Sequence, residues 1–277
     1  MGLKFRKILG IRICAENIEN VLEETRKYLK QFSNSHFQFS KNTLKPLVIF
    51  TPNPEIINYA QKDSTFKEIV NSAQINIPDG TGVVWALKKL YNIRIRAIPG
   101  VELMEKLCSQ AAEKSYTIGL IGGKEGLAVS TAECLQILYP KLIIEVLGEP
   151  EVEVQNSEFR IQNSEGIKIE TEKYFENLLK EIKRKNIDIL FVAFGFPKQE
   201  YFINRIQNSE IRNLNKRPLV MMAVGGSFDY IAGRVPRAPL WLRERRLEWL
   251  YRLIREPGRI KRQIIGAKFF LQLLFGF

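Results

Sequence analysis

Residues Leu47 to Gly82 read LVIFTPNPEIINYAQKDSTFKEIVNSAQINIPDGTG, and this stretch decides the fold. The apolar run at its start predicts a buried strand, which leads into the polar turn TPNP at residues 51–54. A helical segment follows, and a second apolar run leads into the polar turn PDGTG at 78–82. In α/β sheets, ligands bind beyond the carboxyl ends of strands. Thr51, Asn53 and Asp79 are therefore the first candidates for a functional site.

The rest of the chain repeats this alternation of strand and helix. Apolar runs at Tyr116–Ile121, Ile187–Phe194 and Pro218–Val224 predict buried strands, and each ends in glycines and polar residues. The pattern predicts an α/β fold: a Rossmann-like, mainly parallel sheet covered by helices, with a basic helical appendage at the C-terminus. We place the catalytic domain at residues 1–233 and the appendage at 234–277.

Two segments are predicted to differ from this pattern. Residues Lys7 to Cys14 alternate apolar and polar side chains and predict a single strand. The hexapeptide RIQNSE occurs at Arg160–Glu165 and again, unchanged, at Arg205–Glu210. We interpret both copies as short insertions in surface loops, since lengthening a loop costs little.

The charge of the chain is strongly positive and unevenly placed. The net charge is +12, which favours anionic partners such as phosphorylated substrates, anionic lipid or nucleic acid. Residues Arg234 to Arg262 contain ten basic and three acidic side chains, a net of +7. The three scattered cysteines predict a reduced protein without disulfides. No signal peptide and no apolar run of about 18 residues is found, so no membrane-spanning helix is expected.

The appendage is predicted to contain two helices. A basic helix at Trp241–Arg255 is broken by Pro257-Gly258, and a second helix from Arg259 ends in the apolar sequence AKFFLQLLFGF. Basic residues beside Phe and Leu suit a helix that lies in the membrane interface. The alternative is a terminal helix that docks on the protein core.

One further motif allows two interpretations. The turn Gly122-Gly123-Lys124-Glu125-Gly126 links a predicted strand to a predicted helix, an arrangement that can hold a phosphate on helix N-terminal amides. A tight turn that needs glycine explains the same residues equally well.

Several motifs in order resemble one enzyme family. TPN and PDGTG are followed by GFPKQE at 195–200, GGSFDYIAG at 225–233, RAP at 237–239 and LEWLYRLIREPGR at 247–259. Together they resemble the WecG/TagA/CpsF family of glycosyltransferases, from about Ile8 to Arg262. The resemblance implies a bacterial enzyme, peripheral on the inner, cytoplasmic face of the cell membrane. It implies an inverting transfer of N-acetylmannosamine or its uronic acid from a UDP-sugar to polyprenyl-diphosphate-linked N-acetylglucosamine, in the synthesis of teichoic acid or another surface polysaccharide.

The resemblance also implies roles for particular residues. Asp79 matches the family's proposed catalytic Asp, the base that takes the proton of the acceptor hydroxyl, with Thr51 and Asn53 holding sugar or phosphate beside it. From the residues alone, Asp79 could equally be a helix N-cap. Gln199 and Asp229 match further substrate-binding positions, each with helix capping as the alternative. The arginines that match the family's appendage, and would bind the leaving diphosphate, are Arg252, Arg259 and Arg262.

The chemistry of the leaving group agrees with an arginine clamp. Departing UDP carries developing negative charge that needs a metal or basic side chains. The sequence contains no DxD motif, and the planar guanidinium suits phosphate oxygens. We therefore expect neither a metal nor another cofactor.

One position departs from the family pattern. Where many members carry an arginine three residues before the glycine that opens a helix, this chain has Ala97, and Arg96 lies one residue earlier. Either the appendage supplies the missing charge or the substrate differs.

Two other functions would suit parts of this sequence. A Rossmann-like nucleotide-binding oxidoreductase would carry a GxGxxG fingerprint after its first strand, which is missing here. A basic nucleic-acid-binding protein would need aromatic platforms, whereas Trp241, Trp249 and Tyr251 have apolar neighbours typical of a core. We expect no nucleic-acid partner, and the sequence leaves open whether the chain forms a homo-oligomer.

Overall fold

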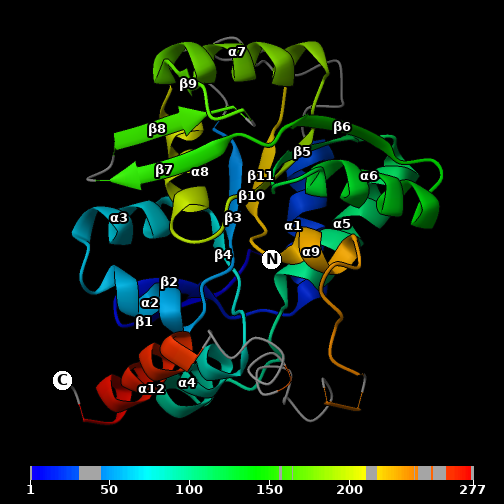
Figure 1. Ribbon diagram of the computed structural model, residues 1–277. Coiled ribbons are helices and arrows are strands. Elements are labelled where there is room, and N and C mark those ends of the chain that lie inside the picture. The colour runs from blue at the N-terminus through cyan, green and yellow to red at the C-terminus, as the bar shows by residue number, and fades with distance from the viewer. Residues whose placement is uncertain are drawn as a thin grey trace.

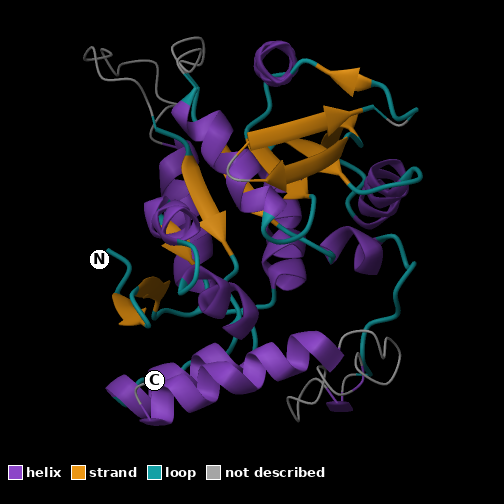
Figure 2. Cartoon of the chain, turned by 60° about the vertical axis from the view of Figure 1, so that its left-hand side comes forward, coloured by secondary structure: helices purple, strands orange, loops and turns teal. Residues whose placement is uncertain are grey.

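A parallel sheet of six strands forms the centre of the molecule (Figures 1 and 2). The computed structural model describes residues 2–30, 45–155, 158–163, 165–209, 217–239, 241–242, 251 and 260–275. The strand order is β4-β3-β11-β10-β5-β6, and every neighbouring pair is parallel. The strands are β3 (Leu47–Phe50), β4 (Ile75–Asn76), β5 (Thr117–Gly122), β6 (Ile143–Gly148), β10 (Ile189–Ala193) and β11 (Val220–Ala223). The predicted Rossmann-like, mainly parallel sheet is confirmed.

Helices cover both faces of this sheet. One face packs on α2 (Pro54–Ala60), α3 (Ser64–Ser72), α4 (Thr81–Tyr91), α7 (Thr171–Arg184) and α8 (Lys198–Asn208). The other face packs on α1 (Ile18–Lys30), α5 (Gly100–Lys114), α6 (Leu127–Leu138) and the short α9 (Ser227–Ile231). In β10, Leu190 faces the first core and its neighbour Phe191 faces the second. This alternation explains why the strands are apolar throughout, since both faces of a parallel sheet are buried.

The N-terminal segment corrects the prediction of a single strand over Lys7–Cys14. It forms an antiparallel hairpin, β1 (Phe5–Ile8) and β2 (Ile11–Cys14), outside the main sheet. The two residues between the strands, Leu9 and Gly10, have φ of 47° and 79°. Positive φ at both positions is the geometry of a two-residue hairpin turn, and Gly10 adopts it without steric cost. The alternating pattern continued through the turn and concealed it.

The two copies of RIQNSE correct the prediction of surface loops. In the first copy, Arg160–Gln162 lie in β8 (Glu158–Gln162), the middle strand of a small antiparallel sheet with β7 (Glu151–Gln155) and β9 (Lys168–Ile169). In the second copy, Arg205–Asn208 form the last turn of α8. The isoleucine is buried in both places. The same residues therefore form a strand in one place and a helix in the other.

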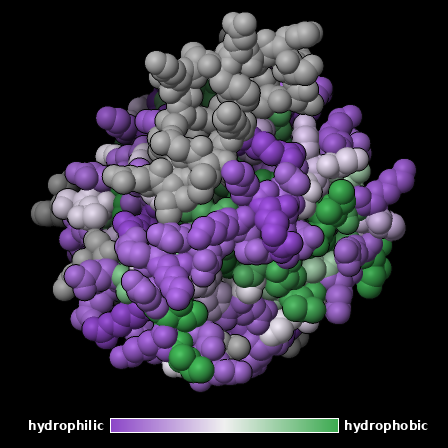
Figure 3. All heavy atoms as spheres, turned by 90° about the horizontal axis from the view of Figure 1, so that it is seen from above, coloured by the Kyte–Doolittle hydropathy of each residue, from purple (hydrophilic) through white to green (hydrophobic). Residues whose placement is uncertain are grey.

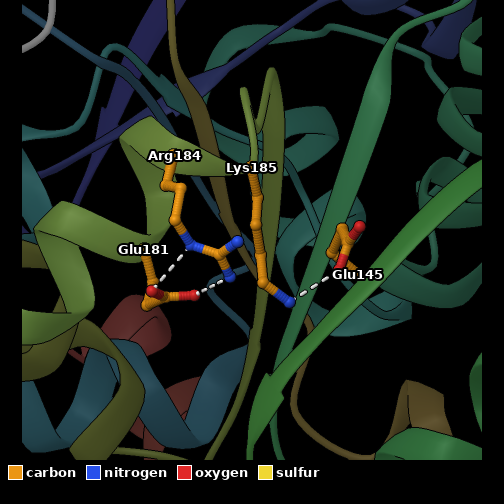
Figure 4. A network of polar contacts seen from close by, with 4 residues as sticks. All are labelled: Glu145, Glu181, Arg184 and Lys185. Carbon is orange, nitrogen blue, oxygen red and sulfur yellow. Dashed lines mark hydrogen bonds and ion pairs between the residues drawn. The ribbon is translucent and has the colours of Figure 1, made fainter.

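Ionic contacts hold α7 to the edge strand β6 (Figure 4). Lys185, at the C-cap of α7, lies with its Nζ 2.6 Å from Oε2 of Glu145 in β6. Beside it, Arg184 binds both carboxylate oxygens of Glu181 within the helix. Basic residues in the last turn of a helix also interact favourably with the helix dipole.

The C-terminal helix α12 (Ile260–Phe275) confirms the predicted helix within the described residues. It packs on α2 and lies beside α4 (Figure 1). Phe269 is fully buried in the core of the first face, and the Phe270 ring lies 5.0 Å from that of Trp85. Among the residues that the structure describes, no helix combines the length and apolar character that crossing a bilayer requires.

Candidate active site

The predicted site residues lie at the carboxyl ends of four adjacent strands. Thr51 directly follows β3, Asp79 follows β4, Gln199 is the second residue of α8 after β10, and Asp229 lies in α9 after β11. The strand order β4-β3-β11-β10 makes these four ends neighbours. Residues from separate parts of the chain therefore lie at the carboxyl ends of neighbouring strands, the position where α/β proteins bind ligands.

Backbone hydrogen bonds fix Asp79 beside the first polar turn. Beyond β4, the Ile77 amide donates to the Phe50 carbonyl at 2.9 Å, and the Asp79 amide donates to the Pro52 carbonyl at 3.3 Å. The turn that carries Asp79 thus runs alongside residues 50–52. Thr51 is almost buried there, whereas Asp79 is half-exposed.

The structure bears on the alternative that Asp79 is a helix cap. The N-cap of α4 is Gly80, in a conformation with φ of 80°. Asp79 lies one residue before it and does not occupy the capping position.

Asn53 combines a structural role with its place in the site. It is the N-cap of α2, and its Oδ1 accepts a hydrogen bond from the Ile56 amide at 3.0 Å. The amide nitrogen of its side chain is the group that can donate to a ligand.

Gln199 is held by hydrogen bonds at both ends of its side-chain amide. Its side chain is 3% exposed, its Oε1 accepts a hydrogen bond from the Gly225 amide at 2.9 Å, and its Nε2 donates to Oε1 of Glu200 at 3.0 Å. Gln199 therefore connects the turn after β10 to the turn after β11.

The turn after β11 also brings in a residue that the sequence did not single out. Ser227 is 5% exposed and its hydroxyl donates to the Val224 carbonyl at 2.6 Å. A Cβ placed on Gly100, the first residue of α5, would lie 3.4 Å from Cγ2 of Thr51 and 3.8 Å from Oγ of Ser227. Ser227 and Thr51 thus flank the start of α5. The motif GGSFD contains Ser227, but the family resemblance points to Asp229, which is half-buried two residues later.

Backbone amides of the glycine turn before α6 already donate hydrogen bonds to another residue of the protein. The carboxylate of Glu149 accepts hydrogen bonds from the Gly126 and Ala128 amides at the start of the helix. Arg234 donates to the carbonyl oxygen of Lys124 within the turn. These contacts favour the structural interpretation of the turn, because the amides that a phosphate would use already bind a carboxylate.

The appendage reaches the site through α12. A Cβ on Gly82, near the start of α4, would lie 2.6 Å from Cγ of Pro54 and 3.3 Å from Cζ of Phe270. Close packing at Gly82 therefore brings α12 against the first turns of α2 and α4, the two helices that follow the Asn53 and Asp79 turns.

The predicted arginines are only partly described. Arg252 and Arg259 lie outside the described residues, and Arg262 belongs to α12 although its side chain is not described. Within the described residues, no three His, Cys, Asp or Glu side chains gather closely enough to hold a metal ion.

Position 97 lies next to the Asp79 turn. The amide of the following residue, Ile98, donates to the Pro78 carbonyl at 2.9 Å. Ala97 is half-buried at this point and Arg96 is exposed. The departure from the family pattern therefore affects the immediate surroundings of the site.

Comparisons with known proteins agree on one family. A sequence model of the glycosyl transferase WecG/TagA/CpsF family matches residues 6–276. A protein of Bacillus subtilis (strain 168) is 34% identical over 228 residues, 82% of this chain and 78% of the relative. Proteins of Staphylococcus aureus strains MW2 and NCTC 8325 are each 32% identical over 234 residues, 84% of this chain and 82% of the relative. All three relatives are named N-acetylglucosaminyldiphosphoundecaprenol N-acetyl-beta-D-mannosaminyltransferase.

Proposed function

The chain belongs to the WecG/TagA/CpsF family of glycosyltransferases, and from this we propose which sugar it moves and how. The donor is a UDP-sugar, UDP-N-acetylmannosamine or its uronic acid. The acceptor is N-acetylglucosamine linked to a polyprenyl diphosphate. The product extends a lipid-linked precursor of teichoic acid or another surface polysaccharide. The names of the curated relatives support this choice of sugar and acceptor.

The observation that carries the mechanism is the position of Asp79 beside Thr51 at two adjacent strand ends. A sugar hydroxyl is a weak nucleophile and needs a base in the transition state. Asp79 accepts the proton of the acceptor hydroxyl while that oxygen bonds to the anomeric carbon of the donor. The bond from this carbon to the diphosphate breaks, and UDP leaves with the bonding electrons. Attack opposite the leaving group inverts the anomeric centre.

The neighbouring residues orient the two substrates. The Asn53 amide nitrogen and the Thr51 hydroxyl bind sugar hydroxyls or phosphate oxygens beside Asp79. Gln199 acts on the donor by setting the turn after β11, and Asp229 in that turn binds the uridine or ribose. Holding the reacting atoms in line in this way can supply a large part of the rate acceleration.

Arginines of the appendage neutralise the departing diphosphate. We assign this role to Arg252, Arg259 and Arg262, because guanidinium groups bind phosphate oxygens in pairs and keep their charge at any working pH. The packing of α12 on the helices that follow the Asn53 and Asp79 turns supports it.

Chelation tests the arginine clamp. With EDTA present, turnover is expected to stay within about twofold of the untreated enzyme, since guanidinium groups replace a divalent metal. Added Mg²⁺ or Mn²⁺ is the control. Loss of turnover on chelation, with recovery on adding metal, would contradict the clamp.

The appendage also provides the contact with the membrane that holds the acceptor. Residues 1–233 form the catalytic domain and residues 234–277 the appendage. Leu271, Leu274 and Phe275 on α12 are exposed apolar side chains. They insert among the lipids of the inner membrane face, while the basic residues of the segment attract anionic headgroups.

The function is tested by supplying the proposed substrates. Purified full-length protein is incubated with UDP-N-acetylmannosamine and a short-chain polyprenyl-diphosphate N-acetylglucosamine in detergent. Release of UDP and a product heavier by one N-acetylhexosamine are expected. UDP-N-acetylglucosamine and UDP-glucose serve as donor controls. A product formed with a control donor, and none with UDP-N-acetylmannosamine, would reject the proposed sugar.

A further inference from the structure

A buried carboxyl group lies directly behind the proposed site. Glu200, the third residue of α8, is 0% exposed. Its Oε1 accepts a hydrogen bond from Nε2 of Gln199, and its Oε2 is buried without a hydrogen-bond partner among the residues that the structure describes. Burying an incompletely bonded carboxyl group is unfavourable. An apolar side chain would fill the same space without that cost, but it could not accept the hydrogen bond from Gln199.

Two hydrogen bonds, one at each end of the Gln199 amide, agree on which way the amide faces. The Gly225 amide is a donor, so the atom of Gln199 that meets it must be the oxygen. The nitrogen of Gln199 then faces Glu200, which must present an acceptor. Carboxyl and carboxamide groups both offer one at this place, whereas an apolar side chain offers none.

The Gly225 end of this chain of hydrogen bonds lies at the turn that forms the site. Gly225 has φ of 51°, in the left-handed region, and it is followed by Gly226 and Ser227. Val224, just before it, is held separately by a hydrogen bond from its amide to the Val192 carbonyl at 3.0 Å. Gln199 is therefore the side chain that holds the Gly225 amide, beside the hydrogen bonds from the Ser227 amide and hydroxyl to the Val224 carbonyl within the same turn.

We infer that Glu200 is a positioning residue of the transferase. It orients the Gln199 amide, and through the Gly225 amide it sets the turn that carries Ser227 and Asp229 against the substrates. This inference rests on the proposed function for its effect on turnover. The hydrogen-bond relay itself can be measured without any substrate.

The test compares Glu200→Leu with Glu200→Gln. Leucine has a similar size but no acceptor, whereas glutamine keeps the acceptor for Gln199. Gln207→Leu, which replaces a buried polar side chain elsewhere on α8, is the matched control. In Glu200→Leu, exchange of the Gly225 amide with solvent, followed by NMR, should become roughly tenfold faster, the effect of one lost hydrogen bond. Exchange of the Val224 amide should stay unchanged, and both amides should behave as in the wild type in Glu200→Gln.

Turnover gives the second measurement. We expect kcat/KM to fall roughly tenfold in Glu200→Leu and to stay within about twofold in Glu200→Gln and Gln207→Leu. Equal losses in both Glu200 variants, or faster exchange at Val224 as well as Gly225, would overturn the inference and indicate a general effect on stability. Absence of turnover in the wild type would instead reject the proposed function, and the exchange data would still decide the relay.

Discussion

At the scale of single residues, Asp79 is the group whose replacement says most about the chemistry. Asp79→Asn keeps the size of the side chain and removes its basicity. We expect kcat to fall by about 10²- to 10⁴-fold with little change in KM, which is the usual contribution of a general base. Initial rates of UDP release measure it.

A second aspartate provides the control for that variant. Asp63 is the N-cap of α3, and its side chain accepts a hydrogen bond from the Phe66 amide at 2.9 Å. Asparagine caps helices equally well, so Asp63→Asn should keep nearly full activity. Full activity in Asp79→Asn would exclude Asp79 as the base.

The burial of Glu200 leads to a separate prediction, which concerns how the free energy of unfolding depends on pH. Burial raises the pKa of its carboxyl group to about 7 from an ordinary value of 4.5. Because the folded state binds this proton more tightly than the unfolded state, the carboxyl group lowers the free energy of unfolding as pH rises from about 4.5 to 7, and the loss is complete above 7. Above pH 7 the free energy of unfolding is lower by roughly 3 kcal/mol for this reason.

Glu200→Gln should remove this dependence, because the carboxamide does not ionise. We expect the variant to gain stability relative to the wild type between pH 5 and pH 8, by up to about 3 kcal/mol. Urea unfolding of both proteins at each pH measures the difference, in which contributions from all other groups cancel. A difference that stays constant with pH would show that Glu200 is already ionised, or already neutral, throughout this range.

At the scale of elements, the RIQNSE repeat shows how context decides local structure. The same residues lie in β8 at 160–162 and in α8 at 205–208. In each place the buried isoleucine joins the same core. Burial of that side chain outweighs the small differences in intrinsic propensity between helix and strand.

The docking of α12 is a second feature of this scale. Phe269 is fully buried, whereas Leu271 on the same helix is 53% exposed. Phe269→Ala should lower the free energy of unfolding by about 3–5 kcal/mol if α12 unfolds together with the core. Leu271→Ala should change it by less than about 0.5 kcal/mol.

Thermal or urea unfolding, together with limited proteolysis around residues 260–275, measures the role of α12 in the fold. Early cleavage there in Phe269→Ala, but not in Leu271→Ala, is the expected pattern. Unchanged stability and unchanged cleavage in Phe269→Ala would mean that α12 is not held by this contact. A loss of turnover accompanying the early cleavage would support the arginine clamp.

At the scale of the whole molecule, the distribution of charge and of exposed apolar side chains bears on membrane binding. The side beyond α7 is mainly hydrophilic, with separate hydrophobic patches (Figure 3). Leu274 and Phe275 on α12 are exposed, and the sequence from residue 234 to 262 has a net charge of +7. Exposed apolar side chains together with this charge predict that α12 faces the membrane.

Vesicle binding tests that orientation. We expect the double variant Leu274→Asp, Phe275→Asp to bind anionic vesicles at least roughly tenfold more weakly, because two apolar side chains no longer enter the lipid. The matched control places the same two aspartates on α6, at the exposed Ile137 and Leu138, and should bind nearly as the wild type does. Binding should also weaken as salt rises from about 0.1 to 0.5 M. Equal binding by the two double variants would reject α12 as the contact.

Much of this protein could be read from the sequence. Hydrophobic periodicity is a local property, and it located the buried strands β3, β5, β10 and β11 of the central sheet, but it merged β1 with β2 and missed the small sheet of β7, β8 and β9. The alternation of strand and helix predicted a parallel sheet, and the ordered motifs identified the family, which the comparisons confirm. The roles of Asp79, Thr51 and the arginines remain predictions.

Only the tertiary structure decided which distant residues meet. The order β4-β3-β11-β10 places the Gln199 and Ser227 turns beside Thr51, and no local propensity encodes strand order. The same is true of the contact between Gln199 and Gly225, the burial of Glu200 and the use of Glu149 at the α6 amides. A side chain's hydrogen-bond partner depends on three-dimensional packing, because the free energy of burial is shared among residues far apart in the chain. The sequence by itself therefore determined the elements and the candidate residues, and the packing of the sheet determined the site.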